Sequence, residues 1–303
     1  TKSVIRFGSE SLTVFAKVLY KQATHRVALQ VSLSQERRVR VDGKSIVGQA
    51  LVSRIIPVLT MAPGGVDLVF DGPGDRRRFM DWGAFHFGGG SSTLFSTYRR
   101  VVAQRNSVLR NGTLDEVSLA GWDIQLASLG ESIDGLRQAF VISLRPAFAH
   151  YCEQLGLGLD LTLEYSRGWV EGELASALYQ SRSRDRRYRV STRGPHRADL
   201  LICRDGNKVG DVLSRGQAKI VNLALLFAQV ELAKSVGATP VLCLDDPGAE
   251  LDQDRLEMLW DQLDNFGIQS LVTGVTPSRI GLGLRQSKMT KSFHVKRGQI
   301  LQM

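Results

Sequence analysis

The segment from Pro240 to Asp246 constrains the fold of this chain more than any other, because an apolar run there ends in two adjacent carboxylates. A strand that is apolar along its whole length is typical of a parallel sheet covered on both faces. Acids at the end of such a strand lie at the carboxyl edge of the sheet, where open α/β folds bind ligands. Helical and strand patterns alternate from Ser214 onward. We therefore predict an α/β fold for the last third of the chain.

The two acids at the end of this run suit a particular chemistry. They follow the strand as in a Walker B motif, in which the first carboxylate, here Asp245, would hold Mg²⁺ directly or through water. The second, Asp246, would orient and polarise the water that attacks a nucleotide phosphate. A buried strand that ends in a solvated Asp-Asp turn explains the same residues equally well. The run alone therefore leaves both interpretations open.

A second pattern lies upstream, where Ser214-Arg215-Gly216-Gln217 precedes an apolar helical stretch. Serine is a common N-cap, so an ordinary helix start is one interpretation. A hydroxyl, a glycine and a helix amino terminus also form an anion site, as in the signature motif of ABC ATPases. The signature, the helix and the acidic strand follow one another in that order. This order favours the nucleotide-binding interpretation.

Two further segments follow the acids. Ala249-Glu250-Leu251-Asp252 occupies the place of a D-loop, with Glu250 and Asp252 as its acidic members. The apolar run from Ser270 ends at Thr273, where many ABC ATPases have a switch histidine. Thr273 could hydrogen-bond a phosphate or a water molecule, and a plain strand end is an equally good explanation.

The chain is predicted to divide into three segments, 1–82, 83–157 and 158–303. Short alternating runs and an Asp42-Gly43 turn signal in 1–82 predict an antiparallel sheet in the first part of a head domain. Apolar positions in 83–157 are spaced for helices, with a break or kink expected at Pro146. We expect this helical arm to be inserted between the two parts of the head.

The formal net charge of +9 favours an anionic partner such as nucleic acid, although surface arginines also serve solubility. Clustering favours the anionic partner, because neighbouring arginines can match successive phosphates. The clusters are Arg37, Arg38 and Arg40; Arg76, Arg77 and Arg78; and Arg182, Arg184, Arg186, Arg187 and Arg189.

Other classes of protein are disfavoured by composition. The cysteines Cys152, Cys203 and Cys243 lack CxxC spacing, so we expect neither a disulfide nor a zinc site. No run approaches the length of about 18 apolar residues that a membrane span needs. Residues 1–20 are too rich in charges for a signal peptide. We therefore expect a cytoplasmic protein.

Three blocks of sequence resemble the RecF family of DNA replication and repair ATPases. They are Gly72 to Trp82; Gly194 to Leu200 with the signature after it; and Asp245-Asp246 with Glu250-Leu251-Asp252 after it. They occur in the family's order, so the resemblance covers essentially the whole chain. It implies an ABC-type ATPase head, with a mixed sheet and an antiparallel subdomain, and an inserted helical arm. Pro247-Gly248 departs from the residues usual in the family beside the D-loop.

The resemblance also implies cofactors, partners and roles. Two heads would enclose ATP and Mg²⁺, and the signature, Ser214 to Gln217, would contact the nucleotide bound to the other head. Asp245 would hold Mg²⁺ and Asp246 would activate water in the same head. The ATP-dependent homodimer would bind double-stranded and gapped DNA and meet recombination mediator proteins, in recombinase loading and the SOS response. Arg76 to Arg78 are candidates for phosphate contacts, and a salt-bridged surface turn is the other explanation for them.

One expected motif is not found in the sequence. A P-loop requires G-x-x-x-x-G-K-[ST], but the Gly-Lys-Ser at Gly43-Lys44-Ser45 has Arg38 in the first glycine position. It also lies at a predicted hairpin, so we do not interpret it as a P-loop. RecF proteins carry this loop near their start, and we expect it upstream of Thr1 in a segment missing from this sequence.

Two other functions would account for part of the same pattern. An ABC transporter ATPase subunit would share the signature and the acidic strand, but the helical insert and the arginine clusters argue against it. A fragment without a P-loop could also bind DNA or a partner protein without hydrolysing ATP.

Overall fold

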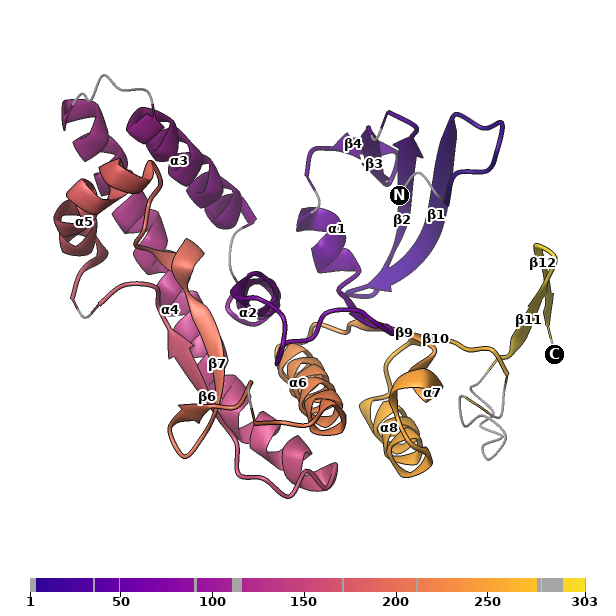
Figure 1. The fold of residues 1–303 in the computed structure, drawn as a ribbon. Helices are drawn as coiled ribbons and strands as arrows, with labels where there is room; N and C mark the ends of the chain where they lie inside the picture. The colour runs from indigo at the N-terminus through magenta and orange to yellow at the C-terminus, as the bar shows by residue number, and fades with distance from the viewer. Residues whose placement is uncertain are drawn as a thin grey trace. The chain divides into compact units, whose positions relative to one another are not determined.

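The fold is that of a computed structural model, which describes residues 4–34, 36–48, 50–89, 92–110, 116–170, 172–210, 212–276, 279 and 291–302. The chain forms two compact units: unit 1 is Thr1–Leu59 with Val66–Val241, and unit 2 is Thr60–Gly65 with Leu242–Met303. Helices and strands occur in both, which confirms the predicted α/β class (Figure 1). Among the described residues, no helix combines the length and apolarity that a membrane crossing needs.

Unit 1 begins with an antiparallel sheet in the order β1-β2-β3-β4. Its strands are β1 (Ser11–Tyr20), β2 (Ala23–Ser32), β3 (Arg37–Val41) and β4 (Lys44–Ile46). Asp42 and Gly43 join β3 to β4 with positive φ of 50° and 80°, as a tight hairpin turn requires. The predicted antiparallel sheet and turn are confirmed. Lys44 begins a strand, so the Gly-Lys-Ser sequence is part of a hairpin and not a strand-to-helix loop.

Helices form most of the remainder of unit 1. They are α1 (Ala50–Ile55), α2 (Pro73–Phe87), α3 (Ser92–Arg110), α4 (Glu116–Gln154), α5 (Leu174–Tyr188) and α6 (Arg215–Ser235). Helix α4 is central, because α2, α3, α5 and α6 all pack against it. Gly83 of α2 permits one such contact, since a Cβ there would lie 2.1 Å from the ring of Phe140 in α4. Tyr98, Leu126 and Leu174 belong to the buried cluster between α3, α4 and α5.

One expectation about these helices is wrong. We expected a break or kink at Pro146, and a break is wrong, because α4 continues through this proline as one helix of 39 residues. Proline removes one N–H donor and crowds the preceding turn. The buried side chains of Leu144, Ala147 and Phe148 hold both sides of Pro146 in the helix. The Ser/Arg-rich stretch near Arg184 forms the second half of α5.

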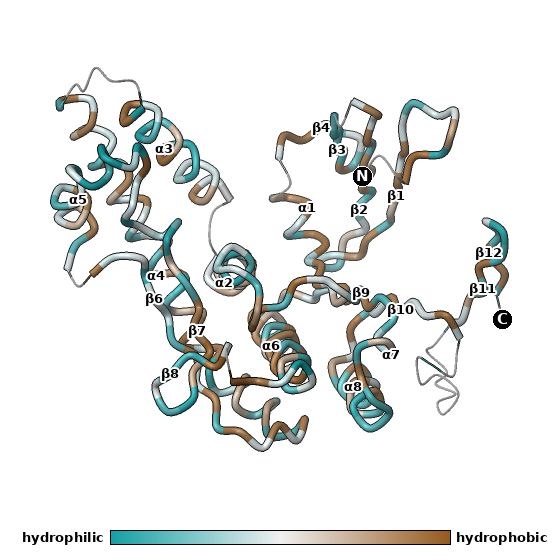
Figure 2. Tube along the Cα trace, in the orientation of Figure 1, coloured by the Kyte–Doolittle hydropathy of each residue, from teal (hydrophilic) through white to brown (hydrophobic). Residues whose placement is uncertain are grey.

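A small antiparallel sheet completes unit 1, in the order β6-β7-β8. Its strands are β6 (Thr162–Ser166), β7 (Asp199–Arg204) and β8 (Asn207–Lys208), and the short helix η2 (Pro195–Arg197) precedes β7. Hydrophilic colours dominate α5, whereas hydrophobic stretches are prominent in β7 and α6 (Figure 2). The same contrast holds for burial, because α6 buries residues along most of its length.

Most of the sheet of order β10-β9-β5 belongs to unit 2. Its strands are β5 (Val58–Met61), β9 (Val241–Asp245) and β10 (Ser270–Thr273), and β9 and β10 are parallel. The parallel strand predicted from the apolar run is confirmed. Helices α7 (Pro247–Glu250) and α8 (Gln253–Phe266) lie between β9 and β10 in sequence. Strands β11 (Phe293–Lys296) and β12 (Gln299–Gln302) form an antiparallel hairpin.

The two predicted segment boundaries fall at different places relative to the helices. The boundary at residue 82 falls within α2, and the boundary at 157 follows the end of α4. The division into a head and an inserted arm stays a prediction.

Candidate functional site

The carboxyl edge of the parallel sheet in unit 2 brings together three predicted site residues. The register pairs Asp245 with Thr273, so the last residues of β9 and β10 lie side by side. The Thr273 hydroxyl donates a hydrogen bond to Asp245 Oδ1. The backbone N–H of Asp246 donates to the carbonyl of Thr273 at 3.0 Å. Because β9 and β10 are parallel, the two acids and Thr273 share one end of the sheet.

Asp246 has two unusual properties at this edge. Its backbone is left-handed, with φ 42° and ψ 56°, and it caps the start of α7. Its Oδ1 atom is buried and has no hydrogen-bond partner within the described parts of the chain. An unsatisfied buried acceptor costs about 1–3 kcal/mol, so such an atom is typical of a position that receives a ligand or a water molecule. The turn that follows β9 therefore holds one carboxylate oxygen ready to accept a hydrogen bond.

Pro247-Gly248, which departs from the residues expected beside the D-loop, lies directly after Asp246. Pro247 is the first residue of α7, where its missing N–H costs no helical hydrogen bond. A Cβ added at Gly248 would lie 1.9 Å from the carbonyl oxygen of Arg279. Only glycine fits this close backbone approach. Local packing in unit 2 therefore requires the glycine, and the start of α7 accommodates the proline before it.

The two acidic D-loop residues have different surroundings. Glu250 is the last residue of α7. Asp252 caps α8, because its side chain accepts the N–H of Arg255 at 3.0 Å and also pairs with the Arg255 guanidinium. Asp252 is thus held by the start of the helix that follows it.

The acids at this edge fit a magnesium ion. The described residues contain no cluster of three or more His, Cys, Asp or Glu that could hold a metal by itself. Magnesium bound with a nucleotide needs no such cluster, since one or two carboxylates, water and phosphate oxygens complete its coordination. Asp245 supplies one such carboxylate at the end of β9, and the unpartnered oxygen of Asp246 beside it can accept a hydrogen bond from a water molecule.

The signature residues start α6 in unit 1. Ser214 is the N-cap, and its hydroxyl accepts the N–H of Gln217 at 3.2 Å. The side chain of Gln217 in turn accepts the N–H of Ser214 at 2.9 Å, which completes a capping box. The serine therefore acts as an ordinary cap, as the simpler interpretation requires.

The capping box does not require a glycine at position 216. The φ of Gly216 is not positive, and a Cβ added there would meet nothing closer than the Ser214 hydroxyl at 3.9 Å. Glycine near the start of a helix is also less favourable than alanine, by up to about 1 kcal/mol. Ser214, Arg215 and Gly216 are all exposed. An exposed glycine that the fold does not need is typical of a place where a ligand approaches the backbone.

The three arginines proposed for DNA lie on the first turns of α2 but differ in their contacts. Arg76 forms a bidentate ion pair with Asp199, at 2.7 and 3.0 Å, and its side chain is 13% exposed. Arg77 donates to the carbonyl of Ala198 at 2.9 Å. Arg78 is 74% exposed and pairs with Asp75. Of the three, only Arg78 presents its guanidinium broadly to solvent.

The block from Gly194 to Asp199 has a role that sequence reasoning missed. The Tyr98 hydroxyl donates to His196 Nδ1 at 2.8 Å, and His196 Nε2 donates to the carbonyl of Ser191 at 2.9 Å. Burial lowers the pKa of His196 to about 4, so the ring is neutral at pH 7. Arg137 of α4 donates to the carbonyl of Pro195 at 2.7 Å. The block thus connects α3 and α4 to the start of β7, and no local pattern reveals partners so distant in sequence.

The chain is similar in sequence to known proteins over almost its whole length. No protein-family model matches it. It is 35% identical over 306 residues to "DNA replication and repair protein RecF" of Saccharophagus degradans, covering 99% of this chain and 83% of that protein. It is 34% identical over 302 residues to the protein of the same name from Pseudomonas syringae pv. syringae, covering 99% and 82%.

Solved structures agree on the fold. A structure of the recombination mediator protein RecF with ATPrS, from the RecFOR pathway, matches with a TM-score of 0.82 at 20% identity, covering 100% of this chain and 83% of that chain. The Smc head domain from Pyrococcus furiosus matches with a TM-score of 0.51 at 10% identity, covering 97% and 77%. The described fold is therefore shared with the RecF protein and with the Smc head domain.

Proposed function

This chain belongs to the RecF family of DNA replication and repair proteins, and on that premise we propose that it is a DNA-repair ATPase that hydrolyses ATP between two copies of itself. The observation that carries the proposal is the carboxyl edge of unit 2. There Asp245, Asp246 and Thr273 lie together, and one buried carboxylate oxygen of Asp246 has no partner among the described residues. This arrangement is what a Walker B strand provides.

Each acid has a proposed role in the same head. Asp245 would hold Mg²⁺, which when bound neutralises charge on the nucleotide phosphates. The Thr273 hydroxyl holds Asp245 in place through its hydrogen bond. Asp246 would accept a proton or hydrogen bond from the attacking water through its unpartnered oxygen.

The signature would act on the nucleotide of the other copy. The amino terminus of α6 carries exposed N–H groups and a partial positive charge. Gly216 allows the backbone to approach a γ-phosphate closely, and Arg215 adds a positive charge beside it. Binding of ATP would therefore stabilise a homodimer. The proposal requires a phosphate-binding loop, and residues 1–303 contain no G-x-x-x-x-G-K-[ST] sequence.

The dimer would bind double-stranded and gapped DNA in the cytoplasm, with recombination mediator proteins as partners. The basic charge of the chain supports an anionic partner. Arg78 is our first choice among the three candidate arginines, because Arg76 and Arg77 are engaged within unit 1. An ABC transporter subunit is not favoured, since the relatives are named for DNA replication and repair.

Substitution of the two acids in the full-length protein tests the catalytic assignment. Asp246→Asn should reduce ATP hydrolysis by about 10²–10⁴-fold, as loss of a general base predicts, while the ATP-dependent dimer persists in analytical ultracentrifugation. Asp245→Asn should weaken both hydrolysis and dimerisation, because Mg-ATP is held less well. Asp254→Asn, an exposed acid in the first turn of α8, is the matched control and should change neither. Normal hydrolysis by Asp246→Asn would show that the assignment is wrong.

DNA binding is tested separately through the arginines of α2. Arg78→Ala should lower duplex affinity and reduce the slope of log K against log salt by about 0.9, since one phosphate contact is lost. Arg76→Ala should instead lower stability, because Asp199 loses its partner. Equal affinity and slope for wild type and Arg78→Ala would remove Arg78 from the DNA interface.

A further inference from the structure

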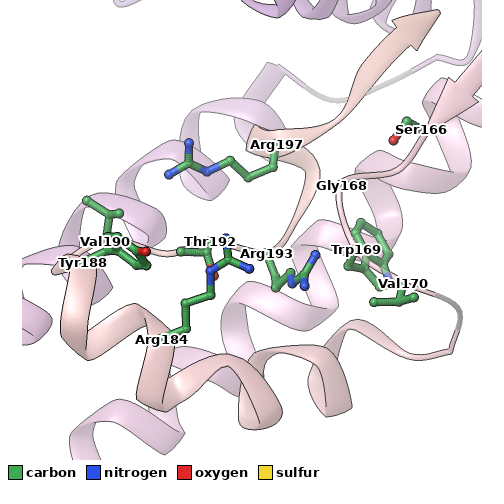
Figure 3. A pocket seen from close by; sticks show the side chains of 10 residues that line it. All are labelled: Ser166, Gly168, Trp169, Val170, Arg184, Tyr188, Val190, Thr192, Arg193 and Arg197. Atoms are coloured by element: carbon green, nitrogen blue, oxygen red, sulfur yellow. The ribbon is translucent and has the colours of Figure 1, made fainter.

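A pocket of about 730 Å³ lies in unit 1, lined by the end of β6, the second half of α5 and the segment before β7 (Figure 3). Pockets of about 300–1,000 Å³ are large enough for small molecules. Its lining includes Arg184, Arg193 and Arg197 and no acidic residue. The guanidinium groups of Arg184 and Arg193 point toward the space between α5 and the segment that contains Thr192 (Figure 3). The pocket is therefore a positively charged concavity.

The charges of these arginines are not neutralised by the described carboxylates. Arg193 forms no hydrogen bond or ion pair with any described residue. Arg197 donates to the backbone carbonyl of Ser191 at 3.2 Å and pairs with no described acid. On the same helix as Arg184, by contrast, Arg182 pairs with Asp123 at 2.8 Å. Helix α5 thus has one set of arginines that stabilises the fold and another that faces the pocket.

The nearest acid in sequence is already used inside the fold. Asp185 is completely buried and accepts hydrogen bonds from Arg105 at 2.7 Å and from the Thr192 hydroxyl at 2.6 Å. It follows Arg184 along the chain but serves the interior side of α5. An anionic group that enters the pocket therefore meets arginines that form no ion pair with a described carboxylate.

An aromatic side chain adds a second kind of contact. Tyr188 lines the pocket and is 56% exposed. The guanidinium carbons of Arg184 and Arg187 each lie 5.8 Å from the centre of its ring. Guanidinium groups bind phosphate with planar, two-pronged hydrogen bonds, and an exposed aromatic ring stacks on a nucleobase. An acidic peptide would use the charges but would have no need of the ring.

We propose that this pocket binds an unpaired nucleotide, with Arg184, Arg193 and Arg197 around the phosphate and Tyr188 stacked on the base. Bases in a duplex are paired and stacked on each other, so they cannot reach the tyrosine. A nucleotide of a single-stranded segment and a free nucleotide present the same chemistry. The inference goes beyond the proposed function, because it requires neither hydrolysis of ATP nor binding of a duplex.

Fluorescence anisotropy with a short labelled oligo-dT, in the absence of ATP, tests the proposal on the full-length protein. Arg193→Ala should weaken binding several-fold and reduce the salt slope by about 0.7, the value for one phosphate of a single strand. Tyr188→Ala should weaken binding about tenfold, whereas Tyr188→Phe, which keeps the ring, should bind like wild type. Because Arg193 has no partner in the described residues, its loss should leave the melting temperature unchanged.

The matched control is Arg100→Ala, an exposed arginine of α3 outside the arginine clusters, which removes the same charge from the same unit. It should bind oligo-dT like wild type. Displacement of the probe by dTMP would identify a free nucleotide as the ligand, and failure of dTMP with success of unlabelled oligo-dT would identify a strand. The proposal is overturned if Arg193→Ala and Arg100→Ala weaken binding equally, if Tyr188→Phe behaves like Tyr188→Ala, or if a blunt duplex or a poly-glutamate peptide competes as well as oligo-dT. Since the assay contains no ATP, failure of the ATPase proposal leaves its result unaffected.

Discussion

At the scale of single residues, Thr273 connects the two strands that carry the candidate catalytic edge. Its hydroxyl donates to Asp245 Oδ1, and its carbonyl accepts the N–H of Asp246 at 3.0 Å. The backbone contact is independent of the side chain, whereas the hydroxyl contact is not. The orientation of Asp245 therefore depends on a single oxygen atom of the neighbouring strand.

Replacement of this hydroxyl tests its role in positioning Asp245. Thr273→Val keeps the shape of the side chain but removes the donor, so we expect ATP hydrolysis to fall about tenfold, the equivalent of about 1.4 kcal/mol. The concentration of Mg²⁺ needed for half-maximal rate should rise, and Thr273→Ser should restore both values. Steady-state hydrolysis across a magnesium titration measures the effect. An unchanged magnesium dependence in Thr273→Val would mean that Asp245 needs no help from β10.

At the scale of elements, a single substitution at the start of α6 should change stability and ATP-dependent dimerisation in opposite directions. Gly216→Ala should stabilise unit 1 by up to about 1 kcal/mol, since alanine favours a helix and the nearest atom to the added Cβ lies 3.9 Å away. The same change should weaken ATP-dependent dimerisation, because a methyl group would stand where a phosphate approaches. Urea denaturation and analytical ultracentrifugation measure the two effects.

A helical glycine elsewhere provides the control for this prediction. Gly135 of α4 is exposed, and a Cβ added there would meet nothing within 4 Å. Gly135→Ala should give a similar gain in stability and leave dimerisation unchanged. If Gly216→Ala dimerises as well as Gly135→Ala does, the start of α6 is only a helix cap.

The helices of unit 1 also depend on one buried cation. Arg105 of α3 is fully buried and donates to Asp123 of α4 at 2.6 Å and to Asp185 of α5 at 2.7 Å. Arg105→Met fills the space but leaves both acids without this partner, so we expect a loss of about 3–5 kcal/mol in the free energy of unfolding. Arg100→Ala, an exposed arginine of the same helix, should change it by less than about 0.5 kcal/mol. Equal stability of the two variants in urea denaturation would contradict this role.

The elements that could be predicted from sequence are those specified by neighbouring residues. The Asp42-Gly43 hairpin and the acids at the end of β9 follow from turn chemistry and an unbroken apolar run. The helical form of the Ser/Arg-rich segment could not be predicted, because its arginines are held by acids far away, as Arg182 is by Asp123. Arg76 looked free for DNA for the same reason, since its partner Asp199 lies 123 residues away.

At the scale of the whole molecule, two half-buried histidines make the fold sensitive to acid. Burial lowers the pKa of His86 and of His196 to about 4, compared with 6.5 for an exposed imidazole. Between these values the unfolded chain binds more protons than the folded chain, so stability rises with pH in this window. Their full contribution is present above about pH 6.5 and is lost as the pH falls toward about 4.

We therefore expect the free energy of unfolding to fall by about 2 kcal/mol per histidine, or about 4 kcal/mol in all, between about pH 7.5 and about pH 5. Urea denaturation followed by circular dichroism at the two pH values measures this difference. His196→Gln changes the stability at both pH values, but it should halve the difference between them because one titrating group has been removed. The double variant with His86→Gln should remove most of it. Burial also raises the pKa of Asp81, which acts in the opposite sense, with stability lost as the pH rises. A pH difference that stays the same in His196→Gln would show that this ring is not the group that takes up a proton as the molecule unfolds.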